Sequence, residues 1–415
     1  MSSHPQLIMN ATLGRFRLSV LEQIKTKLRS NGHYRTRRRF SLKSSETIRV
    51  LGIESSCDDS CASIVDSQRR ILSNVRLNQN DLHSIYNGIH PLYAAHAHQI
   101  NITYHAPVVI GRALQQAGLN LTEIDAIAYT RGPGLAACLA VGATAAKSLA
   151  IGLGIPLVAV HHMQAHALTP LLTDINKGIN FPFLSLLVSG GHTMLVLVKS
   201  SSEFKILANT ADKALGLAID KVSSALGLAW PHGSGSPGSE LECFAYGSSS
   251  KAGPESTPPL PLALRTTSSI FSFCGLQTAT IRRLGSVTQG RPIEDTVEER
   301  KAIGRAFFEA AFGQIEMKLS HWIEELNVKQ GIKVTGVVVS GGVGSNKVLR
   351  SRISNLLSSI DSKLKLHLPP IEYCTDNAAM IAWTGIDKLL RGKVSRRDLP
   401  VVADWSIEQA EDEDL

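Results

Sequence analysis

An apolar run, a polar turn and a second apolar run follow one another twice in this chain, and this repeat limits the folds that the chain can adopt. The first copy spans residues 48–65 around the turn 54–60, and the second spans residues 183–198 around the turn 189–193. Short apolar runs bounded by turn residues predict strands that are buried in a sheet. The repeat therefore indicates two halves that begin with the same strand–turn–strand unit.

A second repeat extends the similarity between the halves. The mostly apolar residues 125–130 run into Arg131-Gly132-Pro133-Gly134, as residues 334–340 run into Gly341-Gly342-Val343. Each pattern predicts a buried strand, a glycine turn and then a helix, the first helix being the alanine-rich residues 135–149. We predict an α/β protein with two similar subdomains and a cleft between them.

The two repeats are unequally spaced, which indicates an insertion in the second half. The segment 231–269 is rich in Ser, Gly and Pro, and its Pro258-Pro259 pair is incompatible with a central strand. We predict a loop region over the cleft, and a connector without a functional role is the alternative.

Composition places the chain among globular proteins and locates its excess positive charge. Its 415 residues are 43% hydrophobic with a mean hydropathy of +0.04, which suffices for two ordinary domains. No apolar run of membrane-spanning length is expected, and hence no membrane among its partners. Residues 1–47 hold ten of the 43 Lys and Arg and two of the 35 Asp and Glu, so that 33 of each remain beyond them. Any RNA contact must then come from local basic groups, for which we consider Arg282, Arg283, Arg350 and Arg352.

The basic N-terminal segment predicts a cellular address. Residues 1–47 combine Arg, Lys, Ser and Leu, contain few acids and lack the long apolar core of a secretory signal. This composition is typical of a mitochondrial transit peptide, although a disordered basic arm that binds RNA has a similar composition. The six cysteines contain no zinc-ribbon pair and are expected to be reduced thiols, as in a matrix enzyme.

Two histidines and a distant carboxylate form a candidate metal site. His162 and His166 are four residues apart, so on a helix they share a face, and Asp376 can complete the set from far downstream. Two His and one carboxylate leave coordination positions open. The alternative is that the histidines lie on a helix surface and that Thr375 or Asp376 caps a helix that begins near Ala378.

Glycine turns predict a second type of site. The turns Ser189-Gly190-Gly191 and Ser340-Gly341-Gly342 let backbone amides approach an anion, and their occurrence in both halves favours a nucleotide. No Lys followed by Ser or Thr closes either run, which excludes a Walker loop. Asp220 can accept hydrogen bonds from ribose hydroxyls, although an exposed ion pair with Lys221 at a helix end is the more ordinary interpretation.

Taken together, these motifs resemble the tRNA adenosine threonylcarbamoyltransferase family, and specifically its mitochondrial stand-alone branch. The resemblance covers nearly all of residues 48–400, and the order and spacing of the motifs make it specific. The matching motifs are Glu54-Ser55-Ser56-Cys57-Asp58-Asp59, Gly132-Pro133-Gly134, His161-His162-Met163, residues 187–193, Asp220-Lys221, residues 271–276, Gly341-Gly342-Val343 with Asn346, and Cys374-Thr375-Asp376-Asn377 with residues 380–382.

The resemblance implies a fold and a reaction. It implies a duplicated ribonuclease-H-like fold of the actin, hexokinase and acetate kinase type, with subdomain I at residues 48–165 plus 377–415 and subdomain II at residues 166–376. It also implies transfer of a threonylcarbamoyl group from threonylcarbamoyl-AMP to the exocyclic amine of the adenosine 3′ of the anticodon. The expected substrates are mitochondrial tRNAs that read codons beginning with A, and the expected assembly is a homodimer.

The family's site residues map onto this sequence one by one. One divalent metal ion per subunit, with iron expected before zinc, would be held by His162, His166 and Asp376. The adenylate would be lined by Leu187, Val188, Ser189, Gly190, Gly191, Asp220, Gly233 and Asn346.

Four departures from the family pattern concern activity or the adenylate site. Acidic residues that the family commonly carries are replaced by Leu217, Lys213 and Leu92, and Pro231-His232-Gly233 replaces a double-glycine turn. A non-catalytic scaffold is therefore one alternative, and an ATP-dependent small-molecule kinase of the same fold is another. A metallopeptidase is disfavoured because Met163 stands where a zinc peptidase needs its glutamate.

Overall fold

The computed structural model describes residues 47–412 apart from residues 87, 104–107, 175–177, 230–234, 248–258 and 262–268. These residues belong to one compact unit, Thr47–Leu415. The predicted transit peptide, residues 1–47, thus lies outside the described residues except for Thr47, and so does Gly233.

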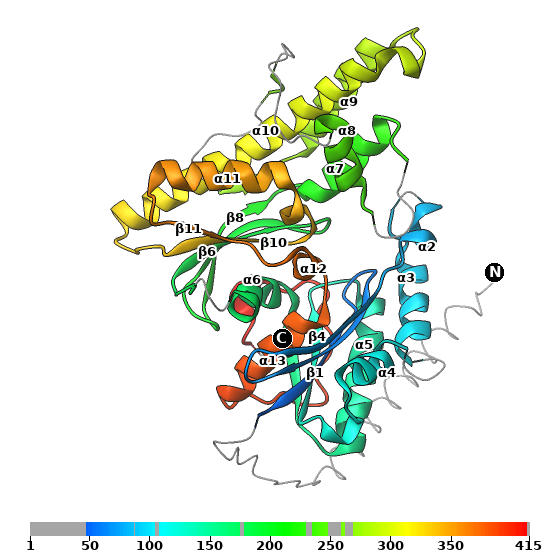
Figure 1. Cartoon of the computed structure of the whole chain (residues 1–415), viewed down its shortest axis with the longest axis vertical. Coiled ribbons are helices and arrows are strands. Elements are labelled where there is room, and N and C mark those ends of the chain that lie inside the picture. Colours follow the sequence, from blue (N-terminus) through cyan, green and yellow to red (C-terminus); the bar gives the residue numbers. More distant parts are fainter. Residues whose placement is uncertain are drawn as a thin grey trace, which may run out of the picture. The chain divides into compact units, whose positions relative to one another are not determined.

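Two sheets organise the described chain (Figure 1). The first has the strand order β3-β2-β1-β4-β5 and is formed by β1 (Arg49–Glu54), β2 (Ser60–Asp66), β3 (Ile71–Leu77), β4 (Ala126–Gly132) and β5 (Leu157–His161). The second has the order β11-β10-β6-β7-β8-β9 and is formed by β6 (Phe183–Val188), β7 (Thr193–Val198), β8 (Phe204–Thr210), β9 (Ile270–Phe271), β10 (Gly336–Ser340) and β11 (Lys365–His367).

The two sheets share one topology, which confirms the predicted duplication. The first strand of each half, β1 or β6, pairs antiparallel with the next strand and parallel with β4 or β10. The outer pairs repeat as well, since β2–β3 and β7–β8 are antiparallel while β4–β5 and β10–β11 are parallel. Among the described strands, β9 alone has no counterpart. The predicted α/β fold of ribonuclease-H-like type is therefore correct.

Helices cover both faces of each sheet, which explains why strands such as β2, β4, β6 and β7 are buried along their whole length. The outer face of the first sheet packs against α4 (Val108–Ala117) and α5 (Ala136–Leu153). The outer face of the second packs against α7 (Leu215–Ala225), α8 (Pro237–Tyr246), α9 (Cys274–Thr288), α10 (Val297–Glu324) and α11 (Lys347–Ile360).

Two helices, α6 (His162–Thr173) and α13 (Ala378–Leu390), lie between the sheets (Figure 1). Ala165 and Leu172 of α6 pack with strand residues of the first sheet and with α13, whereas Met163 and Leu168 pack with the second sheet. One helix therefore contacts both halves. The predicted boundary at residues 165/166 falls inside α6, and that at residues 376/377 falls just before α13. Both stay a prediction.

Short elements complete the chain. They are α2 (Asn80–Ser84), α3 (Pro91–His98), α12 (Ile371–Cys374), the π-helical turns Gln99–Thr103 and Glu325–Lys329, and the 3-10 turns Leu121–Glu123, Ile293–Thr296, Gly342–Ser345 and Ile407–Gln409. Beyond α13 the chain returns to both halves. Ser395 accepts a hydrogen bond from the Ala159 amide, and Glu408 accepts one from Ile206 of β8 at 2.8 Å.

Two sequence-based expectations need correction. The segment 231–269, predicted as a loop, contains helix α8, which Ser236 caps by accepting a hydrogen bond from the Ser239 amide, with Pro237 at the first helical position. Helix α5 is also long and apolar enough to cross a membrane by length and composition, with a mean hydropathy of 1.6. Its residues Val141, Ala143 and Ala146 are buried in the core of the first sheet, and core helices meet the same criterion.

Candidate active site

Helix α6 begins where β5 ends, and His161 fixes this start. The His161 Nδ1 accepts hydrogen bonds from the amides of Met163 and Gln164 at 3.1 and 3.3 Å, and its Nε2–H donates to the Trp405 carbonyl at 3.0 Å. Burial lowers the pKa of His161 to about 3, so the ring is neutral and can fill both roles. As a result His162 lies in the first turn of α6 and His166 one turn later on the same face.

Asp376 meets both histidines from the segment between α12 and α13. Its Oδ1 lies 3.1 Å from His166 Nε2 and 3.5 Å from His162 Nε2. One ligand atom from each of the three residues falls within 4.8 Å of the others. The cap of α13 is Asn377, whose Oδ1 accepts a hydrogen bond from the Met380 amide, so the alternative role of Asp376 as a helix cap is wrong.

Buried groups hold the two imidazoles from behind. His162 Nδ1 lies 3.1 Å from Oε2 of Glu54, a residue with no exposed surface at the end of β1. The Thr130 hydroxyl donates to the same oxygen, and Ser340 Oγ lies 3.4 Å from His166 Nδ1. Because an ionised carboxylate only accepts hydrogen bonds, the Nδ1–H of His162 donates to Glu54, and a metal ion bound at Nε2 would take the place of the proton that Nε2 carries toward Asp376.

The charges around these residues suit a cation. Burial disfavours a charged His162, but the carboxylates of Glu54 and Asp376 outweigh it and raise the pKa of His162 to about 9. Burial likewise raises the pKa of Asp376, but the positive charge of His162 and the hydrogen bond from His166 outweigh it and hold that pKa well below its usual value. Two carboxylates therefore face one protonated imidazole. The donor set of two nitrogens and one oxygen fits a divalent transition metal with open positions.

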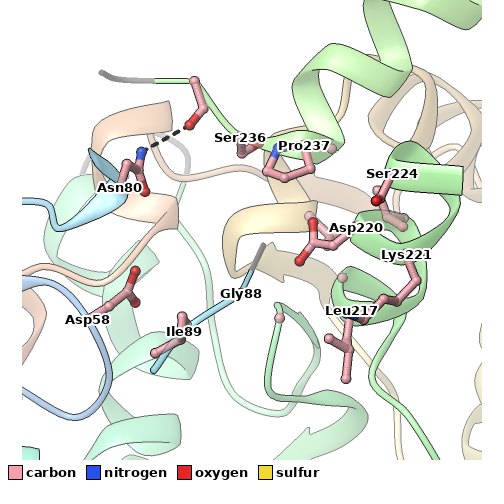
Figure 2. A pocket seen from close by; sticks show the side chains of 16 residues that line it. Asp58, Asn80, Gly88, Ile89, Leu217, Asp220, Lys221, Ser224, Ser236 and Pro237 are labelled. Carbon is pink, nitrogen blue, oxygen red and sulfur yellow. Dashed lines mark hydrogen bonds between the residues drawn. The ribbon is translucent and has the colours of Figure 1, made fainter. Parts of the chain in front are cut away.

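A cavity of about 400 Å³ lies beside this centre. Figure 2 shows Asp58 and Ile89 on one wall and Leu217 and Asp220 of α7 on the other. Further parts of the wall come from Gly190, Val343 and the start of α8 at Ser236-Pro237. The Asn80 side chain donates to the Gly235 carbonyl at 3.1 Å across one end (Figure 2).

The glycine turns bring backbone close to backbone at the cavity. A Cβ on Gly216 would lie 2.6 Å from the Ser189 carbonyl oxygen and 2.7 Å from the Gly190 nitrogen, so only glycine lets α7 start against this turn. Gly341 has φ +95, and a Cβ there would lie 2.3 Å from the Val188 carbonyl oxygen. The two predicted turns are therefore neighbours, because Gly341 packs directly after β6.

The predicted adenylate residues differ in what they can offer. Gly190 and Asp220 line the cavity, and burial raises the pKa of Asp220 to about 7. Leu187 and Val188 have fully buried side chains, so only their backbone is available. Ser189 Oγ accepts hydrogen bonds from the amides of Gly191 and His192 and so closes its own turn.

The structure shows where two of these residues, Asn346 and Asp220, lie. Asn346 caps α11 by accepting a hydrogen bond from the Leu349 amide at 2.9 Å, which accounts for its side chain. Asp220 lies within α7 and is partly buried, so the interpretation as an exposed pair at a helix end is wrong.

Two of the arginines considered for RNA contact are engaged within the protein. Arg352 forms ion pairs with Glu309 and with Glu316, the latter at 2.6 Å. Arg350 donates to the Gly344 carbonyl and contacts Cys374 Sγ at 3.1 Å. Arg352 is therefore a poor source of free positive charge for a phosphate.

Sequence reasoning missed the groups behind the ligands. Glu54 belongs to a matching motif, but the sequence predicts no function for its side chain. The same holds for Ser340 and His161. One signal was available for Glu54, since a carboxylate that ends a strand buried on both faces needs a polar partner. No such signal marked Ser340, because its neighbour His166 is remote in sequence.

A duplicated ribonuclease-H-like fold with a His, His, carboxylate centre beside the cleft defines a class of two-lobed proteins with a central ligand site. Within that class, the chain belongs to the family of TsaD, tRNA N6-adenosine threonylcarbamoyltransferase, whose family model matches residues 70–383. It is thereby a transferase.

Relatives agree with this assignment, and a solved structure agrees with the fold. The enzyme named tRNA N6-adenosine threonylcarbamoyltransferase from Zymomonas mobilis is 35% identical over 86% of this chain and 92% of its own length. That from Bartonella tribocorum is 36% identical over 87% of this chain and 96% of its own length. The crystal structure of T. kodakarensis HypF shares the fold with a TM-score of 0.50 at 13% identity, covering 83% of this chain and 48% of that one.

Proposed function

We propose that this protein transfers the threonylcarbamoyl group of threonylcarbamoyl-AMP to the exocyclic amine of the adenosine 3′ of the anticodon in mitochondrial tRNAs that read codons beginning with A. Family membership supports the reaction on tRNA adenosine. The observation that carries the proposal is the convergence of His162, His166 and Asp376 beside a cavity with a glycine turn. Such a pairing serves a substrate that has both a phosphate and a carbonyl to activate.

The residues of the chain divide the work of this reaction. An adenine amine is a weak nucleophile, so the carbamoyl carbon must be made electrophilic and AMP must leave. A divalent ion at the three ligands, iron or zinc, supplies the Lewis acidity for this step. Glu54 and Ser340 orient the two imidazoles, and the amides around Gly190 face the nucleotide. The bond between N6 and the carbamoyl carbon forms, the bond from that carbon to the phosphate oxygen breaks, and N6 releases one proton to solvent.

The nucleotide cavity suits the donor. Gly190 brings backbone amides to one wall, and Lys221 places a positive charge near the other. Asp220 is positioned to accept hydrogen bonds from the ribose hydroxyls, which are uncharged. Leu217, where the family has an acid, is 38% exposed at this cavity and leaves that wall apolar.

The remaining parts of the proposal concern the cellular location and the oligomeric state of the protein. The composition of residues 1–47 supports import into the mitochondrial matrix. Self-association is supported by large apolar side chains exposed close together around α2 and α3, including Ile85 at 77% and Leu92 at 72% exposure. Tyr86 and Tyr93 stack within the same patch at 5.3 Å between ring centroids. We propose a homodimer through this patch, which sedimentation of Leu92→Asp beside the parent chain tests.

The experiment that tests the function gives the full-length, metal-loaded protein synthetic threonylcarbamoyl-AMP and an unmodified mitochondrial tRNA transcript. Mass spectrometry of the digested tRNA should show threonylcarbamoyladenosine, together with AMP in equal amount. Donor binding with neither AMP release nor modified tRNA would favour the scaffold alternative that the losses at Leu217 and Lys213 permit. ADP formed from ATP with a small-molecule acceptor would favour the kinase alternative.

A further inference from the structure

A second cavity, of about 350 Å³, has no role in the function proposed so far. Its apolar walls are the side chains of Met163, Met194, Ile206 and Ile407. Its polar groups include His192, Asn209, Asp404 and Ser406. The segment 403–407 closes it, and this segment lies beyond the residues that the family model matches.

The second cavity lies close to the metal centre and shares none of its described lining residues with the nucleotide cavity. The turn 189–192 contributes Gly190 to the nucleotide cavity and His192 to the second one. Met163 of the second cavity is the neighbour of His162 on α6. Gly134, also in its wall, packs so closely on Ser56 that a Cβ would lie 2.5 Å from the Ser56 carbonyl oxygen. Ser56 Oγ in turn lies 3.3 Å from His162 Nδ1. The second cavity is therefore separated from the ligand His162 by single residues, Met163 along α6 and Ser56 behind Gly134.

The charged groups in the wall of the second cavity indicate which ligand charge it can accept. No Lys or Arg is among the described residues that line it, and Asp404 brings a negative charge. A phosphate or the threonyl carboxylate of the donor would meet repulsion there without a cationic partner. Burial lowers the pKa of His192 to about 4, so its ring is neutral near pH 7. The cavity is thus suited to a neutral ligand.

The polar groups of this cavity are available for such a ligand. Asn209 uses its Oδ1 to accept a hydrogen bond from the Thr210 amide, and its Nδ2 has no partner among the described residues. The His192 ring likewise bonds to none of them. An amide donor at the rim and thioether side chains inside match the edge and faces of a heterocyclic base.

We propose that the second cavity receives the base of the target adenosine after it swings out of the tRNA. Enzymes that modify a base take it out of the stack and hold it in a pocket, because the reacting atom is otherwise inaccessible. The base would then approach the carbamoyl carbon from the side opposite the nucleotide. This assignment rests on the proposed function and adds to it the location of the acceptor.

Kinetics of matched variants of the full-length protein test the assignment. Asn209→Trp puts an indole at the rim of the second cavity from an exposed position on β8, so it should raise the KM for an anticodon stem-loop RNA at least 10-fold. Its KM for threonylcarbamoyl-AMP should stay within 2-fold. Leu217→Trp, at the nucleotide cavity, should show the reverse pattern. Ser202→Trp, in the exposed turn before β8, controls for the added indole and should change neither KM.

The assignment is overturned if Asn209→Trp leaves the RNA KM unchanged or raises the donor KM instead. A second measurement needs neither a variant nor turnover. A stem-loop that carries 8-azidoadenosine at the target position is irradiated on the wild-type protein, and the labelled peptide is sequenced. Label on Met194 or on residues 403–407 supports the assignment, whereas label on residues 217–221 contradicts it. Failure of the proposed function is a different result, namely no threonylcarbamoyladenosine from the wild-type protein.

Discussion

The turn after β1 and the turn after β6 occupy equivalent places in the two sheets, but they carry opposite chemistry. The first begins at Glu54 and contains Asp58 and Asp59, all three largely buried. The second contains Gly190 and Gly191 and no carboxylate. The strand pairings around both turns are the same. The same backbone frame therefore serves two kinds of ligand.

The difference shows how a duplicated fold builds one asymmetric site. The carboxylate turn holds His162 from behind and lets the imidazole face a cation. The glycine turn exposes backbone amides and leaves room for an anion. Helix α6 joins the two halves, because it contacts both sheets and carries both histidines of the candidate metal site. Each half alone would lack part of the site.

The largest expected effect comes from removing the ligand that crosses to α6. Asp376→Ala should lower metal content and product formation by more than 100-fold, since even the loss of a group behind a ligand costs about 10- to 100-fold in affinity. Elemental analysis and the tRNA assay measure the two. Asp361→Ala is the control, because the exposed Asp361 only accepts a hydrogen bond from the Lys363 amide. Full metal occupancy in Asp376→Ala would show that Asp376 is not a metal ligand.

A second prediction concerns the glycine side. Gly341→Ala should lower the free energy of unfolding by about 3 kcal/mol, because the new Cβ meets the Val188 carbonyl and the backbone is left-handed there. Gly342→Ala is the matched control, since the nearest atom to its Cβ is Thr375 Cγ2 at 4.0 Å. Urea unfolding compares the variants. Equal stability of the two would mean that the close approach of the glycine turns is not needed.

The carboxylate side can be tested without removing a ligand. Glu54→Gln keeps the shape of the side chain but no longer fixes the proton on His162 Nδ1, so metal affinity should fall about 10- to 100-fold. Competition with a chelator measures the affinity. Glu123→Gln, which changes a partly exposed pair with Arg49 and the cap of the turn Leu121–Glu123, should leave metal affinity unchanged. If Glu54→Gln bound metal as tightly as the parent, the orientation of His162 by Glu54 would not contribute to metal affinity.

The smallest expected effect is a pH dependence of the free energy of unfolding that is due to Asp220. It distinguishes Asp220 from Glu54 and Asp376, which face His162. The pKa of Asp220 in the folded protein, about 7, is above the ordinary 3.8, so folding favours the protonated form. The stability from this group is complete below pH 3.8 and is lost as pH rises to about 7. Asp220→Asn should therefore be more stable than the parent by about 1–2 kcal/mol at pH 8, with the difference gone at pH 4. Urea unfolding at both values, beside Asp361→Asn, checks this, and a difference that grows toward low pH would reverse the sign.

Much of the fold was predictable because the duplication is local in sequence. The strand–turn–strand units of β1–β2 and β6–β7 each lie within about 20 residues, and period and turn residues are sufficient to detect them. Helix α8 was missed because Ser, Gly and Pro dominate its surroundings, although Ser236 and Pro237 form a helix start.

The part of the site that could be predicted consists of residue types that commonly bind metals. His162, His166 and Asp376 stood out by type and spacing. The partners behind them did not, because Glu54 and Ser340 reach the histidines only through the packing of both sheets on α6. The second cavity was invisible for the same reason, since its walls come from five separate parts of the chain.

Anomalous diffraction from crystals of the metal-loaded protein tests the central claim most directly. The account predicts one peak above the iron or zinc edge in each subunit, within bonding distance of Nε2 of His162, Nε2 of His166 and an Asp376 oxygen. A fully occupied ion bound elsewhere, or side chains of these three residues that face apart in crystals soaked with metal, would contradict it.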